Sequence, residues 1–145
     1  MLFNDKTICT SWDENTKHAM FQGQTSLGIF VSGDAQCHEE DLDLGNERTG
    51  LTIAEARATI TAMRAKRDYE IKPKLAVLKH LYSNIQTSKD HNPKSHESRM
   101  IRSQIRAIER ELEEINNDIA EEQKSLKEYI DGKDKLYKRL RAKNQ

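Results

Sequence analysis

Residues 101–119 read IRSQIRAIERELEEINNDI, with isoleucine or leucine at alternating spacings of four and three residues. Such spacing places the apolar side chains on one face of a helix and is typical of a coiled-coil seam. A helix with one apolar face needs a surface that buries it, so this stretch predicts a partner helix. The seam positions are Ile101, Ile105, Ile108, Leu112, Ile115 and Ile119.

The upstream residues predict that partner helix, because residues 51–86 carry an apolar stripe of helical period. Residues 87–96 contain no apolar residue and include Asn92-Pro93, which predicts a connection. A connection of about ten residues favours an antiparallel two-helix hairpin. We expect helices at about 51–86 and 95–142. Beyond Ile119 the seam weakens, so the far end of the second helix should fray or dock elsewhere.

Pro73 lies inside the first predicted helix. Proline removes one backbone donor and clashes with the preceding turn of a helix. We therefore expect a kink near Lys72 or two stacked helical pieces.

The N-terminal residues favour strands, with aromatic and β-branched residues concentrated at 7–12, 18–22 and 27–32. Turn-forming residues separate these runs and predict a three-stranded antiparallel meander. Residues 38–50 are acidic, contain two glycines and predict a loop. The expected fold class is α+β, with a β-rich head and acidic loop at 1–50 and a coiled-coil-like helical hairpin at 51–145.

The composition predicts an oligomer. Of the 145 residues, 35% are hydrophobic and 33% charged, whereas an ordinary soluble domain is about 45–50% apolar. One chain alone therefore buries little, and a partner chain must supply the missing core, as a homo-oligomer of two or more copies.

No run of about 18 apolar residues occurs, and the N-terminus lacks the pattern of a signal peptide. We therefore expect a cytoplasmic protein without a membrane partner. Two cysteines, Cys9 and Cys37, are too few for a disulfide framework and are interpreted as buried thiols.

The sequence does not indicate an enzyme. Cys37, His38, Asp41 and Asp43 cluster metal donors, but no second pair gives zinc-site spacing, and a glycine occupies the wrong position for a calcium loop. No phosphate-binding, dinucleotide or nucleophile motif occurs, and the chain has only 6 glycines. We expect neither a catalytic site, a metal nor a cofactor.

Charge is unevenly distributed. Residues 1–50 carry 3 basic and 9 acidic residues, so the rest carries a balancing excess of +6. This asymmetry fits an anion-binding tail, and it equally fits acidic heads docking on basic helices of neighbouring subunits. Duplex nucleic acid is a poorer ligand because the net charge is zero and acidic residues interleave with basic ones.

An anion site is indicated near the helix connection. Arg99, Arg102 and Arg106 are spaced to share one helix face, where guanidinium groups can hold phosphates. Arg57 adds a basic side chain on the first helix. Tyr82 supplies a ring that could stack on a base, and Asn92 supplies a side-chain amide that could hydrogen-bond to the edge of a base or ribose. The alternative is that the arginines are solvated or paired with neighbouring glutamates, and that Tyr82 is ordinary packing.

The pattern of Ala35, Cys37, His38, Asp41 and Asp43 followed by residues 50–58, GLTIAEARA, resembles the first-described family of anti-Thoeris sponge proteins of bacteriophages. The resemblance covers roughly residues 20–110. It implies a β-rich N-terminal region with two C-terminal helices, assembly into higher oligomers, and binding of glycocyclic ADP-ribose without cleavage. Some members also hold cyclic oligonucleotide signals at separate sites.

The resemblance also implies binding residues. The helix arginine of the family falls on Arg57, the aromatic residue on Tyr82 and the polar turn residue on Asn92. The second-helix arginine falls on Arg106 or Arg110, with Arg102 and Arg99 as further candidates. The leading hypothesis is therefore a phage anti-defence protein that sequesters a nucleotide-derived signal in the host cytoplasm.

Two other functional classes remain open. One is a coiled-coil structural protein, assembly factor or chaperone, which the seam at 101–119 favours. The other is a protein-binding inhibitor of a host defence effector, acting through the acidic head.

Overall fold

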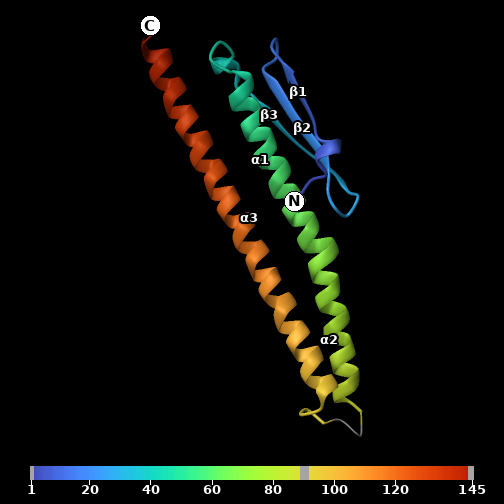
Figure 1. Cartoon of the computed structure of the whole chain (residues 1–145). Helices are drawn as coiled ribbons and strands as arrows, with labels where there is room; N and C mark the ends of the chain where they lie inside the picture. Colours follow the sequence, from blue (N-terminus) through green and yellow to red (C-terminus); the bar gives the residue numbers. More distant parts are fainter. Residues whose placement is uncertain (1, 89–91, 144–145) are drawn as a thin grey trace. The chain divides into compact units, whose positions relative to one another are not determined.

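The computed structural model describes residues 2–88 and 92–143 (Figure 1). A small antiparallel sheet is followed by helices, so the predicted α+β class with an N-terminal sheet is confirmed. The chain forms two compact units. We call residues 2–64 with 119–143 the sheet unit and residues 65–118 the helical unit. The domain boundary predicted near residue 50 divides the chain by secondary structure, with the strands before it and the long helices after it, whereas the two units divide the chain by compactness.

The sheet contains β1 (Cys9–Asp13), β2 (His18–Gln24) and β3 (Phe30–Gln36) in the order β1-β2-β3, and the predicted meander is confirmed. The third strand begins at Phe30, not at Leu27. Residues 25–29 form a turn in which the Thr25 amide donates to the Ile29 carbonyl at 2.8 Å and Gly28 has a φ of +79°. That conformation suits glycine, so the strand starts only after the turn.

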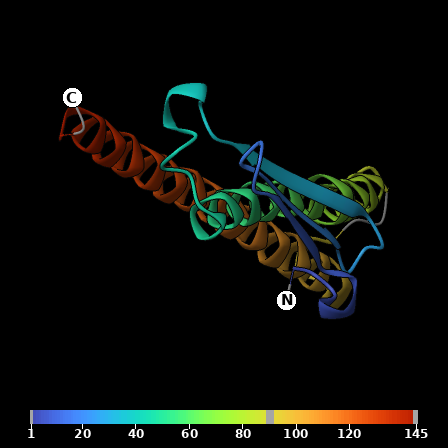
Figure 2. The ribbon, with the colours of Figure 1, turned by 90° about the horizontal axis from the view of Figure 1, so that it is seen from above.

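One face of the sheet is buried, and β2 and β3 alternate buried and exposed residues along their length. α1 (Glu47–Lys66) covers this face through Ala54 and Ala58 (Figures 1 and 2). Gly33 of β3 lets the helix approach closely, because a Cβ there would lie 2.2 Å from the Ala54 carbonyl oxygen. Glycine and alanine side chains therefore set the spacing between helix and sheet.

α1 begins at Glu47, four residues before the predicted helix start. Asn46 precedes it, and its Oδ1 accepts a hydrogen bond from the Thr49 amide at 2.9 Å. An asparagine that accepts from an amide three residues on is an N-cap, which the acidic composition of residues 38–50 obscured. Within the predicted loop, residues Glu39–Asp41 also form a 3₁₀ turn.

The predicted interruption near Lys72 is present. α1 ends at Lys66, a π-helical turn follows at Arg67–Ile71, and α2 spans Lys72–Gln86. Pro73 lies in the first turn of α2, where its missing N–H costs least. The wider π turn accommodates the proline ring, which would otherwise clash with the preceding turn.

α3 spans His96–Lys143 and includes the whole seam. In the helical unit, Leu75 of α2 packs with Ile101 and Ile105 of α3, and Ile108 and Leu112 pack against them. All six seam residues are buried or half-buried, so the predicted apolar face is confirmed. The coiled-coil character of the hairpin and the oligomeric state stay predictions.

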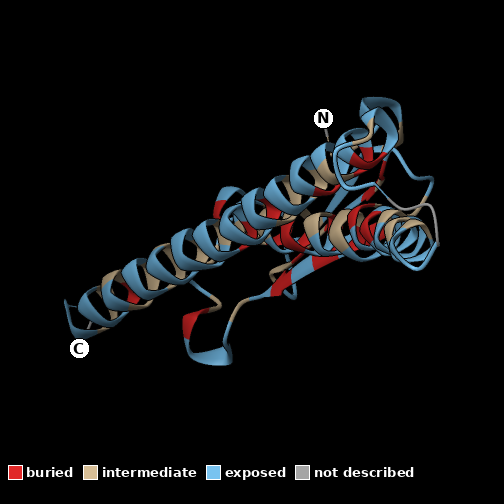
Figure 3. Ribbon diagram, turned by 90° about the horizontal axis from the view of Figure 1, so that it is seen from below, coloured by how far each residue is buried: buried red, intermediate tan, exposed pale blue. Residues whose placement is uncertain are grey.

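The C-terminal part of α3 docks within the sheet unit, which is one of the two alternatives expected for it. Arg141 Nη1 lies 2.7 Å from Glu40 Oε2 and 3.0 Å from Asp41 Oδ1. Tyr137 is buried, and burial raises the pKa of its hydroxyl. Most other positions of this stretch are exposed (Figure 3). Along residues 2–88 and 92–143, no helix combines the length and apolarity needed to cross a membrane.

Candidate functional site

The seven predicted ligand-binding residues are divided between the two units. Arg57 belongs to the sheet unit, and the other six belong to the helical unit. Neither unit by itself contains the complete set. The six are Tyr82, Asn92, Arg99, Arg102, Arg106 and Arg110.

Tyr82 and Asn92 lie near the junction of α2 and α3. Tyr82 is half-buried and packs against the Leu75, Ile101 and Ile105 cluster, so part of its ring supports the core. Asn92 is exposed, and its Oδ1 accepts a hydrogen bond from the Lys94 amide at 2.9 Å. Its side-chain amide nitrogen could donate to a ligand.

Arg102 and Ser98 present buried polar atoms on the first turns of α3. Arg102 is half-buried and donates from Nη2 to the Pro93 carbonyl. Its Nε and the Oγ of Ser98 are buried, and neither has a hydrogen-bond partner within the part of the chain that the structure describes. Buried polar atoms normally have partners. Ser98 was not among the residues predicted from the sequence, although it lies four positions before Arg102.

Arg99, Arg106 and Arg110 are exposed on α3. Arg106 and Arg110 line a shallow depression together with Glu109 and Glu113. The two carboxylates oppose anion binding there, so this depression is a weaker phosphate site than its arginines alone suggest.

Arg57 lines a pocket of about 120 Å³ in the sheet unit. Its Nη1 donates to the Asp34 carbonyl at 2.7 Å, which fixes the guanidinium at the edge of β3. Two rings, Trp12 and Tyr137, contribute to the walls, and Lys133 contributes a second cation from α3. Sequence reasoning missed this pocket because its walls come from strands, a loop and the far end of a helix.

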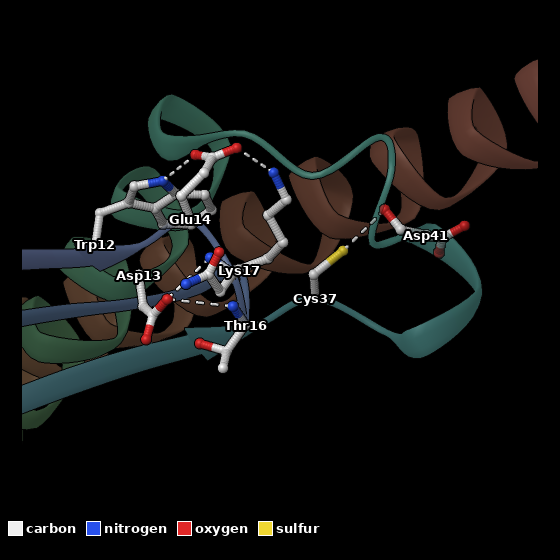
Figure 4. A network of polar contacts seen from close by, with 8 residues as sticks. Trp12, Asp13, Glu14, Thr16, Lys17, Cys37 and Asp41 are labelled. Carbon is white, nitrogen blue, oxygen red and sulfur yellow. Dashed lines mark hydrogen bonds and ion pairs between the residues drawn. The ribbon is translucent and has the colours of Figure 1, made fainter.

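The Trp12 side of the pocket is held by a polar network (Figure 4). Trp12 Nε1 donates to Glu14 Oε2 at 2.7 Å, and the Lys17 ammonium pairs with Glu14 Oε1. The hydrogen bond from Lys17, followed by that from Trp12, lowers the pKa of Glu14. Lys17 itself has a φ of +54°, an uncommon conformation for a residue with a side chain. The network therefore fixes the indole and neutralises the charge of Lys17.

The opposite side of the network joins two residues that had been considered as metal donors. Cys37 Sγ donates to the Asp41 carbonyl at 3.2 Å (Figure 4). Burial, followed by the nearby Asp41 carboxylate, raises the pKa of the Cys37 thiol. Within residues 2–88 and 92–143, no three or more His, Cys, Asp or Glu side chains gather as metal ligands would. His91, which lies in the connection between the helices and would be a further donor, is outside the described residues.

The expectation of two buried thiols is wrong for Cys9. Cys9 is exposed on β1, an edge strand of the sheet, whereas Cys37 is half-buried in the pocket wall. A strand that is paired on one side only leaves more of its residues exposed, so the apolar character of Cys9 did not determine whether it is buried.

Comparisons of the chain with protein-family models, with curated proteins and with solved structures found no match. The resemblance to the sponge family therefore stands on the residues quoted for it.

Proposed function

We propose that the protein binds and sequesters a nucleotide-derived signal, glycocyclic ADP-ribose, in the host cytoplasm and releases it unaltered. The observation that supports this best is the pair of buried, unpartnered polar atoms on Arg102 and Ser98. They lie on the same α3 face, four residues apart, in the unit that also holds Tyr82 and Asn92. A phosphate that displaced the groups covering these two atoms could accept hydrogen bonds from both, and guanidinium–phosphate bonds are strong because they are charge-assisted.

The size of the ligand favours the helical unit over the sheet-unit pocket. Pockets that enclose a drug-sized molecule measure about 300–1,000 Å³. A pocket of about 120 Å³ cannot enclose a molecule with a base, two riboses and a pyrophosphate. Arg57 would therefore contact this ligand only from a neighbouring copy or at the pocket mouth. Cyclic oligonucleotides are larger still, so they too would have to bind outside the interior of this pocket.

Self-association is part of the proposal. The helical unit exposes Tyr69 (69%), Val77 (59%) and Leu81 (47%) at intervals of eight and four along the chain. Tyr69 and Val77 border an apolar groove that Ala107 and Ile108 of α3 also line. Exposed apolar surface of this kind marks an interface.

Charge supports a second copy of the chain as the occupant of this groove. Around the stripe, α2 exposes Lys72, Lys74 and Lys79, whereas residues 109–118 of α3 carry five acidic residues and one basic residue. Two copies packed with α2 against the partner's α3 would bring these opposite charges together. This complementarity supports the proposed homo-oligomer of two or more copies.

Isothermal titration with glycocyclic ADP-ribose tests the function, with linear ADP-ribose and a cyclic dinucleotide for comparison. Heating should then release the ligand intact. Tyr82→Ala and Arg102→Gln should each weaken binding at least tenfold, since a hydrogen bond to a charged group contributes about 1.5–3 kcal/mol. Arg139→Gln, on an exposed position of the sheet unit, is the matched control and should bind normally.

A coiled-coil assembly factor or chaperone is the second candidate, favoured by the 48-residue α3 and the exposed stripe. This candidate would be favoured if none of the three ligands gave a heat of binding, and if Ile108→Asp abolished function while Tyr82→Ala and Arg102→Gln did not. Recovery of altered ligand after heating would instead indicate an enzyme.

A further inference from the structure

The sheet-unit pocket is a built cavity whose interior is too small to enclose the large signal. Its volume of about 120 Å³ is close to that of cavities of about 150 Å³ that hold a benzene molecule. Its walls are mainly apolar, so water inside it is poorly satisfied. A single planar ring is therefore the largest group that it can enclose.

Two aromatic side chains give the pocket a preference for rings. Glu14 holds the indole of Trp12 through a 2.7 Å hydrogen bond, and burial of Tyr137, which is 8% exposed, restricts its ring. Both rings are thus oriented before a ligand arrives, which reduces the entropy lost on binding. Asn46 also lines the pocket and offers a side-chain amide.

The charges around the pocket leave a small positive excess. Lys17 is paired with Glu14, and Asp41 is paired with Arg141. Among the described residues, neither Arg57 nor Lys133 forms an ion pair: Arg57 donates to a backbone carbonyl, and Lys133 lies 5.5 Å from the centre of the Tyr129 ring. Asp134 opposes these two cations with one negative charge.

We propose that this pocket binds a single aromatic ring that carries one phosphate or carboxylate group. The ring enters between the walls that Trp12 and Tyr137 contribute, and the anion meets Arg57 and Lys133. A pyrimidine mononucleotide and an aromatic carboxylate share this chemistry. The site lies wholly in the sheet unit and is separate from the one proposed for the large signal.

Trp12 is the only tryptophan of the chain, so its fluorescence reports this pocket. The full-length protein would be titrated with UMP and with benzoate, and with their uncharged counterparts uridine and benzamide. UMP, benzoate or both should change the fluorescence in a saturable way, at concentrations at least tenfold lower than the uncharged counterparts. Binding of UMP alone assigns the anion as phosphate, and binding of benzoate alone assigns it as carboxylate.

Three single substitutions on one helix test the charge arrangement. Lys133→Gln should weaken binding of the charged ligand about tenfold, since it removes one charge-assisted contact. Asp134→Asn should strengthen binding about threefold, because it removes the opposing charge. Lys135→Gln, one position away, exposed and outside the pocket, should leave binding unchanged.

Cys37 provides a second readout, because its thiol lines the pocket. In a Cys9→Ser background, saturating ligand should slow the reaction of Cys37 with a maleimide. The proposal would be overturned if neither UMP nor benzoate changed the fluorescence, if charged and uncharged ligands bound equally, or if the ligand that binds did not protect Cys37. Tyr82→Ala should not alter the Trp12 signal, so failure here is distinguishable from failure of the sequestration proposal.

Discussion

The sheet unit and the helical unit are packed in opposite ways. In the sheet unit, Gly33, Ala54 and Ala58 bring the backbones of helix and strand into close approach. In the helical unit, large side chains such as Leu75 and Ile105 fill the space between α2 and α3. Close backbone approach leaves no room for an added atom, whereas side-chain packing loses stability in proportion to the volume removed. The two units should therefore respond differently to substitution.

Adding one methyl group to the sheet unit should have the largest effect. In Gly33→Ala, the new Cβ would lie 2.2 Å from the Ala54 oxygen and 2.5 Å from the Ala58 nitrogen, and neither backbone atom can move alone. We expect a loss of more than about 3 kcal/mol in the free energy of unfolding. Urea unfolding followed by circular dichroism measures it.

Gly132→Ala is the matched control for that substitution. A Cβ at Gly132 meets nothing within 4 Å, and the residue lies inside α3. Alanine there should stabilise the protein by about 0.5–1 kcal/mol, because glycine is a poor helix former. A loss of less than about 1 kcal/mol in Gly33→Ala would contradict the close approach.

Removing volume from the helical unit should have the next largest effect. Ile105 is buried in the cluster with Leu75 and Ile101. Ile105→Ala should lower the free energy of unfolding by about 2–3 kcal/mol, and Ile105→Val by about 1 kcal/mol, as the cavity grows. The same urea titration tests this gradation. Equal losses in the two variants would show that strain, not lost volume, governs this unit.

The docking of the α3 end should contribute less. Asp41 is 7% exposed and Arg141 is 29% exposed, and Arg141→Ala would leave the Asp41 carboxylate without its ion-pair partner. We expect a loss of about 1–2 kcal/mol. In a double-mutant cycle with Asp41→Asn, the second substitution should cost less once Arg141 is gone. Additive losses would show that the pair contributes nothing.

The smallest effect should come from Glu14 and should depend on pH. Its folded-state pKa is lowered from the ordinary value of 4.5 by hydrogen bonds from Lys17 and then Trp12. The stabilisation is therefore complete above pH 4.5 and is lost as the pH falls through the lower folded-state value. Wild type should be slightly more stable than Glu14→Gln at pH 7, and the difference should shrink as the pH falls below 4.5. Urea unfolding at pH 7, 5 and 3 measures the difference, and a constant difference would be contrary to this mechanism.

Local sequence signals predicted much of the fold. The aromatic and β-branched residues of the N-terminal runs predicted the sheet, the period of residues 101–119 predicted the apolar face of α3, and the position of Pro73 predicted the break before α2. These features depend on neighbours close in sequence. The start of β3 and the burial of Cys9 were predicted wrongly, because a turn around Gly28 and the edge position of β1 decided them.

The candidate sites were less predictable. Arg57 was singled out from the sequence, but its pocket depends on Trp12 and on Lys133, which lies 76 positions further along the chain than Arg57. Ser98 was not singled out, because only burial shows that its hydroxyl lacks a partner. The periodicity of a helix does not show which of its polar atoms lose contact with water.

The sequence by itself determined where the strands and helices form and which helix face is apolar, because propensity and periodicity act over a few residues. Only the tertiary structure decided that α1 packs closely against the sheet at Gly33. It also decided that Arg141 pairs with Asp41 and that Trp12 and Tyr137 line one pocket. Those contacts join residues 21 to 125 positions apart. Their formation depends on packing that no local pattern encodes.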